Sequence, residues 1–252
     1  MDTFNTKYGL ISLLQNELYI RNEFIYRGYW DEDTLIKLKQ YVDPNRNILE
    51  IGGHCGTSTI VYASYLNNDK KVYVYEPQQN MYNVLMHNIS QNNLQDKIIP
   101  YNSAVFCYNG TGNMNNIDVD GDRGEVEKRY TVENTLPCNF GGISLGKVGE
   151  NVNFTTVDNM NLENIGFIHC DAQGSENYIF SKAIDTITKN RPVIYYEDNR
   201  THSKYLCDIV DDAYPQYKDI SLFDVKQYCM EKLNYKTFID KFNGSIDTLL
   251  IP

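Results

Sequence analysis

The chain has 252 residues, 42% of them hydrophobic, which is enough for one large core but short for two enzyme domains. Lysine and arginine number 23 against 33 aspartate and glutamate residues, so the formal net charge is −10. Such an acidic chain lacks the basic surface of a phosphate-backbone binder, and we expect no nucleic-acid partner.

The cysteines and the first residues indicate a reducing compartment. The cysteines are spread along the chain, which suits neither a zinc site nor a disulfide framework, so we expect buried, reduced thiols. Residues 1–19 mix charged and amide side chains with Leu and Ile, without a signal-peptide or membrane-spanning run. We therefore expect no membrane insertion and an intracellular, cytoplasmic protein, in the host cytoplasm if the source is viral.

The predicted elements begin with a polar leader, residues 1–46, that we expect to be helical and to cover the site as a lid. Its helix spans 31–41, with Asp31 as the N-cap and Pro44 beyond the end. Apolar segments and helical patterns then alternate, which is typical of an α/β fold. Strands are predicted at 47–52, 71–75, 98–105, 152–156, 166–171, 191–197, 235–240 and 246–251, and helices at 57–67, 78–93, 174–189, 202–213 and 223–233.

The last two predicted strands are joined by a Lys-Phe-Asn-Gly-Ser turn, in which Asn-Gly is a strong hairpin signal. The C-terminal hairpin therefore adds an antiparallel strand to a seven-stranded, mostly parallel sheet with helices on both faces. This is the layout of the Rossmann-like class I methyltransferases, which use S-adenosylmethionine.

A glycine turn joins the strand at 47–52 to its helix, in the sequence Asn-Ile-Leu-Glu-Ile-Gly-Gly-His-Cys-Gly-Thr-Ser. Glycine lets the backbone bend tightly and approach a ligand, and the N–H groups of the following helix face the same space. We predict one wall of a nucleotide-type cofactor site here. Its candidate residues are Glu50, Gly52, Gly53, His54, Gly56, Thr57 and Ser58.

Glu76 ends the next predicted strand and is followed by Pro77. A carboxylate at that place can accept hydrogen bonds from both ribose hydroxyls of a nucleoside. The alternative is a favourable charge at the N-terminus of the helix over 78–93. We favour the ribose role because the glycine turn lies upstream.

Four further motifs follow in order: Glu76-Pro77 with Asn80, Leu85, Asn88, Asn92 and Asn102-Ser103-Ala104; Thr156-Val-Asp158; Asp171-Ala-Gln-Gly-Ser-Glu176; and Arg191-Pro192 through Glu197. On these motifs, residues 47–252 resemble the FkbM family of methyltransferases. The resemblance implies a methyltransferase domain over this range and S-adenosylmethionine as cofactor. It places Asn102, Ser103 and Ala104 beside the adenine, and Asp171 and Gln173 at the cofactor. Gln173 stands where the family usually has Glu, which removes a negative charge beside Asp171.

Acids and an amide follow two neighbouring strands of the expected sheet, where Asp171, Glu197, Asp198 and Asn199 should converge. Oxygen-rich sets of this kind hold Mg²⁺, as in the related metal-dependent catechol-type enzymes. The alternative is that Glu197 and Asp198 cap the next helix while Asp171 contacts the cofactor ammonium. We take Asp171 and Asp198 as candidate catalytic residues, with His202 as a candidate base.

An insertion of hairpin and loop is expected over about 106–150. Within it, Asn116 to Gly121 with Glu127 resembles an EF-hand loop, but the flanking segments lack helical patterns. We prefer a polar hairpin, with Asp120-Gly121 as its turn, over a calcium site. The glycine-rich segment 140–149 is expected to be a mobile loop over the acceptor.

Aromatic residues are frequent, and Tyr26, Tyr29 and Trp30 cluster in the leader. They can stack on a sugar or a planar ring, or serve equally well in a core or lid. Tyr195 and Tyr196 lie in an apolar strand and are interpreted as packing residues.

Together these features predict an S-adenosylmethionine-dependent O-methyltransferase. The family resemblance implies that its acceptor is a hydroxyl of a sugar, a glycan or a glycan-linked small molecule. One alternative is a metal-dependent, catechol-type enzyme for small molecules. Another is a catalytically inactive methyltransferase fold that serves as an interaction protein, for which Gln173 is the best evidence. The sequence leaves open whether the chain forms a homodimer.

Overall fold

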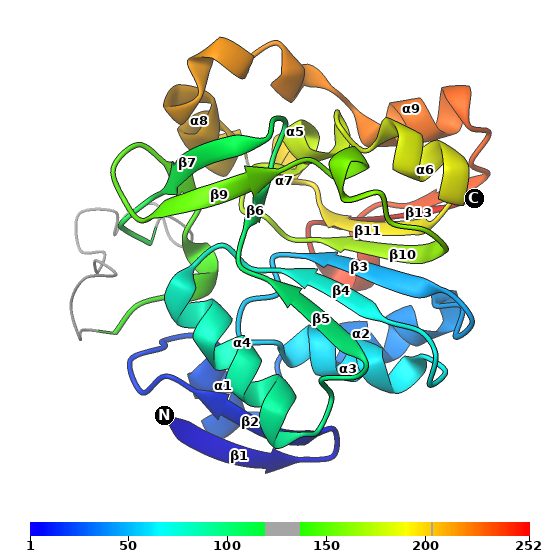
Figure 1. Ribbon diagram of the computed structural model, residues 1–252. Coiled ribbons are helices and arrows are strands. Elements are labelled where there is room, and N and C mark those ends of the chain that lie inside the picture. Colours follow the sequence, from blue (N-terminus) through cyan, green and yellow to red (C-terminus); the bar gives the residue numbers. More distant parts are fainter. Residues whose placement is uncertain (119–136, 203) are drawn as a thin grey trace.

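The computed structural model describes residues 1–118, 137–202 and 204–252. Its centre is a seven-stranded sheet (Figure 1). The strands follow the spatial order β12 (Thr237–Ile239), β13 (Asp247–Ile251), β11 (Val193–Glu197), β10 (Ile165–Cys170), β3 (Asn47–Ile51), β4 (Val72–Tyr75) and β5 (Ile98–Tyr101). β13 alone runs opposite to the other six strands of this sheet, so the predicted α/β class and closing hairpin are confirmed.

Helices cover both faces of this sheet, which explains why its strands are nearly continuous apolar runs. One face carries α2 (Glu32–Leu38), α3 (Thr57–Tyr65) and α4 (Gln79–Gln91). The other carries α5 (Glu176–Phe180), α6 (Ile184–Asn190) and α9 (Val225–Lys232). Three more helices are α1 (Ile20–Tyr26), α7 (Asn199–His202) and α8 (Lys204–Ala213). Two buried cores result, one on each side of the sheet.

The leader contains the helix expected at 31–41, as α2 and a 3₁₀ turn over Lys39–Tyr41, but it begins with an unpredicted antiparallel hairpin of β1 (Asp2–Thr6) and β2 (Gly9–Leu13). One face of β2 is buried through Ile11 and Leu13. The hairpin docks on α4 through the buried side chain of Asn88, which accepts from Ser12 N (2.8 Å) and donates to Ser12 O (3.0 Å). The leader is thereby part of the folded body.

A second, four-stranded sheet contains β6 (Ala104–Val105), β9 (Asn151–Thr155), β7 (Gly110–Met114) and β8 (Leu145–Gly146). The predicted strand 98–105 is therefore two strands in two sheets, and 152–156 lies outside the central sheet. The predicted helix 174–189 is also divided, into α5 and α6. The predicted Asp120-Gly121 turn and most of the EF-hand-like segment with Glu127 lie outside the described residues.

All six cysteines are buried and free of disulfides, as predicted. Within the described ranges, the chain forms no helix with the length and apolar character needed to cross a bilayer.

Candidate functional site

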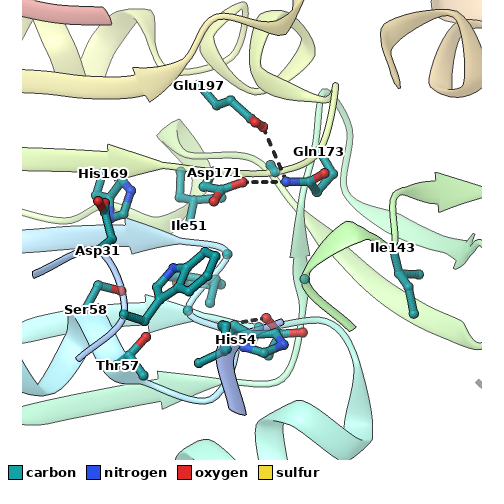
Figure 2. Close-up of a pocket in the computed structure, with 18 of the residues that line it drawn as sticks. Asp31, Ile51, His54, Thr57, Ser58, Ile143, His169, Asp171, Gln173 and Glu197 are labelled. Carbon is teal, nitrogen blue, oxygen red and sulfur yellow. Dashed lines mark hydrogen bonds between the residues drawn. The ribbon is translucent and has the colours of Figure 1, made fainter. Parts of the chain in front are cut away.

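A cavity of about 660 Å³ opens where the parallel strands of the central sheet end (Figure 2). Its walls come from the segments after β3, β4 and β10, from the end of β11, from the leader and from the start of β13. The carboxyl edge of such a sheet is the usual ligand position in open α/β folds.

The glycine turn after β3 forms one wall, and its backbone geometry requires glycine. Gly52 has φ +87°, and a Cβ built there would lie 1.8 Å from the carbonyl oxygen of Asp171. Gly56 has φ +89° and precedes α3, but it does not line the cavity. Five predicted residues of this segment do line it: Gly52, Gly53, His54, Thr57 and Ser58.

Glu76 ties this turn to the end of β4. Its carboxylate is 3% exposed, accepts hydrogen bonds from the backbone N–H groups of His54 and Gln78, both at 2.8 Å, and lines the cavity with Pro77. Burial raises the pKa of Glu76 to about 7, against the hydrogen bonds from Gln78 and His54 that lower it. The two predicted cofactor elements are thus joined by one buried acid.

Only part of the segment that was predicted to flank the adenine lies on the cavity wall. Ser103 and Ala104 line the cavity, whereas Asn102 does not. The Asn102 side chain donates to the carbonyl oxygens of Glu76 and Pro77, both at 3.0 Å. Asn102 therefore supports the wall from behind.

The loop after β10 places Asp171 and Gln173 on the cavity wall together with Glu197 of β11. The Gln173 side chain donates to Oδ1 of Asp171 at 2.9 Å and to Oε2 of Glu197 at 3.4 Å, as Figure 2 shows. Burial and the nearby Asp171 carboxylate raise the pKa of Glu197 well above its ordinary value. An amide group thus lies between the two acids expected to hold a cation.

The predicted magnesium set is not assembled. Asp198 Oδ1 accepts from the N–H of Thr201 at 3.1 Å, which is the capping alternative, and Asn199 donates to Glu197 Oε2 at 2.5 Å. Asp198, Asn199 and His202 are absent from the residues that line the cavity. The described part of the chain contains no group of three or more His, Cys, Asp or Glu side chains placed to hold a metal ion.

Glu50 is also placed differently from the prediction, because it lies behind the cavity wall. It is in register with His169 on β10, which is in register with Tyr195 on β11. The buried Glu50 carboxylate accepts from Ser58 Oγ and lies 3.6 Å from Nδ1 of His169. Glu50 therefore orients a neighbour that does line the cavity.

His169 and Tyr195 line the cavity and were not among the predicted site residues. Burial lowers the pKa of His169, but the Glu50 contact outweighs it and the net direction is upward. Tyr195, interpreted from the sequence as a packing residue, donates to Oδ2 of Asp247 at 2.5 Å, and Asp247 also lines the cavity. The sequence did contain one signal for this part of the site, since His169 is a histidine inside an otherwise apolar strand.

The leader contributes Trp30 and Asp31 to the cavity, whereas Tyr26 and Tyr29 do not line it. Asp31 occupies the predicted N-cap position of α2, but its side chain makes no capping hydrogen bond, and its backbone is left-handed (φ 50°, ψ 32°). Asp31 is exposed at the cavity, and partial desolvation by the surrounding wall raises its pKa to about 6. The predicted cap is thus a cavity residue.

Several buried polar atoms of the wall have no hydrogen-bond partner: Nε2 of His54, Oε1 of Gln78, Oε1 of Gln173 and Oγ of Ser175. Buried polar atoms are normally paired, so unpaired ones on a cavity wall are available to a ligand.

The strand order, the glycine turn after the first central strand and the acid after the second define a class I methyltransferase fold. The chain belongs to the FkbM methyltransferase domain family, whose model matches residues 50–235. The matched region is accordingly a methyltransferase domain. No curated protein matches the sequence.

Similar solved structures include methyltransferase FkbM from Methylobacillus flagellatus KT, 12% identical, with 82% of this chain and 44% of that chain covered and a TM-score of 0.49. The present chain thus spans less than half of that protein. A putative caffeoyl-CoA O-methyltransferase from Staphylococcus aureus is 16% identical, with coverages of 92% and 88% and a TM-score of 0.47. An O-methyltransferase from Bacillus cereus is 14% identical, with coverages of 94% and 98% and a TM-score of 0.43.

Proposed function

We propose that this methyltransferase takes its methyl group from S-adenosylmethionine and transfers it to a hydroxyl of a sugar, a glycan or a glycan-linked small molecule. The observation that carries the proposal is the hydrogen bond from the His54 N–H to Glu76. It brings the glycine turn and the acid after β4 to one cavity wall, where a nucleoside with a charged tail can be held.

The residues present fit this cofactor. Glu76 would accept the ribose hydroxyls, and Ser103 and Ala104 would flank the base. Gly52, Asp171 and Gln173 would bind the amino-acid end of the cofactor. The Asp171 carboxylate can accept hydrogen bonds from its ammonium group, and the Gln173 amide can bond to its ammonium or to its carboxylate group. The cofactor supplies a methyl group activated by a positively charged sulfur, and the chain has to position it against the acceptor.

The cavity volume of about 660 Å³ lies within the roughly 300–1,000 Å³ that is usual for small-molecule sites. The sugar or glycan acceptor is supported by the family resemblance. The catechol-type alternative has less support, since the ligands expected for its metal are directed elsewhere.

Calorimetric titration with S-adenosylhomocysteine tests the proposal, once with Mg²⁺ present and once after chelation. We expect micromolar affinity that is the same in both buffers. Glu76→Gln should weaken binding by at least about tenfold, in line with the roughly 1.5–3 kcal/mol of a hydrogen bond to a charged group. Glu163→Gln, on the exposed surface, is the matched control. No detectable binding by the wild type would overturn the proposal and favour an inactive fold.

A further inference from the structure

We propose that Trp30 and Asp31 form the acceptor subsite, that it takes an uncharged, polyhydroxylated acceptor, and that Asp31 receives the proton of the acceptor hydroxyl. This inference rests on the proposed function and adds the residues that bind the acceptor.

The cavity wall divides according to the family match. Residues inside 50–235 supply the glycine turn, Glu76 and the loop after β10. Residues outside that range supply a further part of the wall, from the leader and from the segment that enters β13. Since the shared region accounts for the cofactor, the additional wall is available to the acceptor.

Asp31 lines this cavity and does not cap the backbone of the helix that it precedes. An aspartate immediately before a helix normally accepts a hydrogen bond from the first turn of that helix. Asp31 accepts from no backbone N–H of that turn and instead shares a hydrogen bond with the side chain of Thr34. Its backbone is left-handed, a conformation that is uncommon for residues other than glycine. Figure 2 shows Asp31 beside His169, at the end of the cavity away from Gln173.

The surroundings of Asp31 suit proton transfer near neutral pH. Thr34 of its own helix and His169 of β10 favour the charged carboxylate, whereas Asp247 at the start of β13 and Asp171 after β10 oppose it. Desolvation by the surrounding cavity wall is the largest effect and brings the pKa of Asp31 to about 6, while the residue stays open to solvent. A base with a pKa close to the working pH is largely in its ionised form and is still basic enough to take up a proton.

The proton and electron balance is complete with these groups. The acceptor O–H gives its proton to the Asp31 carboxylate as the acceptor oxygen forms a bond to the methyl carbon. The bond between that carbon and the sulfur breaks, and its electron pair stays on the sulfur, which loses its positive charge. The proton then passes from Asp31 to water when the product leaves.

The charge of the cavity argues for an uncharged acceptor. Six carboxylate side chains line it: Glu23, Asp31, Glu76, Asp171, Glu197 and Asp247. Arg27 is the sole Lys or Arg among the described lining residues, and it is already paired with Glu23 at 3.5 Å. A phosphate or carboxylate acceptor would find no unpaired Lys or Arg among these lining residues to balance its charge. The indole of Trp30 offers an apolar face, and the carboxylates accept hydrogen bonds from hydroxyl groups.

Saturation-transfer NMR tests the subsite directly, with a panel of methyl glycosides and the corresponding sugar phosphates, in the presence of S-adenosylhomocysteine. The proteins are the wild type, Asp31→Asn, Trp30→Ala and the control Asp33→Asn. Asp33 is an exposed acid on the same helix and does not line the cavity. We expect methyl glycosides to bind the wild type and the control, to bind Trp30→Ala at least about tenfold more weakly, and sugar phosphates to bind none.

Calorimetry with S-adenosylhomocysteine on the same proteins separates the two levels of failure. If the wild type does not bind this ligand, the proposed function itself fails. If all four proteins bind it equally, the NMR results decide on the subsite. The subsite is overturned if no glycoside binds the wild type, if sugar phosphates bind as well as glycosides, or if Trp30→Ala binds glycosides as tightly as the wild type.

The base role of Asp31 has its own readout in a radiolabelled methyl-transfer assay over the glycoside panel. Wild-type turnover should rise with pH through about 6, because Asp31 must be ionised. Asp31→Asn should lose about 10²- to 10⁴-fold in kcat with a smaller change in KM. Unchanged kcat in Asp31→Asn, or no turnover of any glycoside by the wild type, would overturn this role.

Discussion

The side-chain amide of Gln173 donates a hydrogen bond to Asp171 over 2.9 Å, and the same nitrogen lies 3.4 Å from Glu197. A neutral donor therefore holds together two carboxylates that would otherwise repel each other. The departure from the family pattern at position 173 is thus accompanied by a local arrangement that needs no cation for its stability.

Gln173→Glu should destabilise the protein and make it responsive to metal ions. The substitution replaces a donor by a third carboxylate, at a cost of about 1–3 kcal/mol, which corresponds to roughly 2–4 °C in Tm for each kcal/mol. Thermal unfolding should show a lower Tm that Mg²⁺ partly restores. The wild type should show no such response.

Gln95→Glu is the control for this substitution, because Gln95 is exposed and distant in sequence from the acids of the cavity. It should leave Tm unchanged with and without Mg²⁺. A Gln173→Glu protein as stable as the wild type in chelator would contradict the account of the amide.

Glu76 should give the protein a pH dependence with a defined sign. Its pKa rises from 4.5 to about 7 on burial, so the folded state keeps a proton that the unfolded carboxyl releases. The associated stability is present below the unfolded pKa and is lost as the pH rises through about 7. Denaturant unfolding of wild type and Glu76→Gln, compared at pH 5 and pH 8, should show this difference only in the wild type.

Affinity for S-adenosylhomocysteine should change in the opposite direction. Ribose hydroxyls donate to the ionised carboxylate, so binding to the wild type should tighten from pH 6 to pH 8. Calorimetry on Glu76→Gln should give a smaller slope. An equal slope in both proteins would remove Glu76 from the binding site.

Asp198 should matter for stability and not for methyl transfer. Its carboxylate caps the turn that begins α7, and removal of such a cap by Asp198→Ala should cost about 1 kcal/mol of unfolding free energy. Asp198→Asn keeps an oxygen in that place and should cost less. Denaturant unfolding measures both, and a loss of ligand affinity in Asp198→Asn would contradict the capping role.

Gly52 and Gly244 form a matched pair for the backbone of the glycine turn. Both have a left-handed backbone, but a Cβ at Gly52 would overlap the Asp171 carbonyl, whereas nothing lies within 4 Å of one at Gly244. Gly244→Ala should cost about 1–2 kcal/mol for the conformation alone. Gly52→Ala should cost more and abolish binding of S-adenosylhomocysteine. Equal effects of the two on Tm and on calorimetric affinity would argue against the close approach at Gly52.

The central sheet could be predicted because its strands carry continuous apolar runs and its closing hairpin has an Asn-Gly turn. The strand predicted at 98–105 failed because pattern alone does not show that Asn102 turns to bond two neighbouring carbonyls and breaks the strand. The helix at 174–189 failed for a similar reason, since 181–183 fit a helical pattern yet separate α5 from α6. The leader hairpin was missed because its short strands have mixed polarity.

The cavity wall that carries the glycine turn and Glu76 could be predicted because its residues follow local motifs. The other wall could not, because Asp31, His169 and Asp247 meet only through tertiary packing of the leader, β10 and β13. Asp198 and Asp31 illustrate the limit in opposite ways. The sequence assigns the first to a metal and the second to a helix cap, and the fold gives the cap to Asp198 and the cavity to Asp31.

The side chain of Asn88 also donates to the carbonyl of Cys55 in the glycine turn at 2.8 Å, besides its two bonds to Ser12. A single buried amide therefore connects the leader, α4 and the cofactor loop. Detaching the leader would leave its polar atoms unpaired in an apolar interior. A leader grafted from a relative should therefore dock here only if it keeps a backbone partner for Asn88.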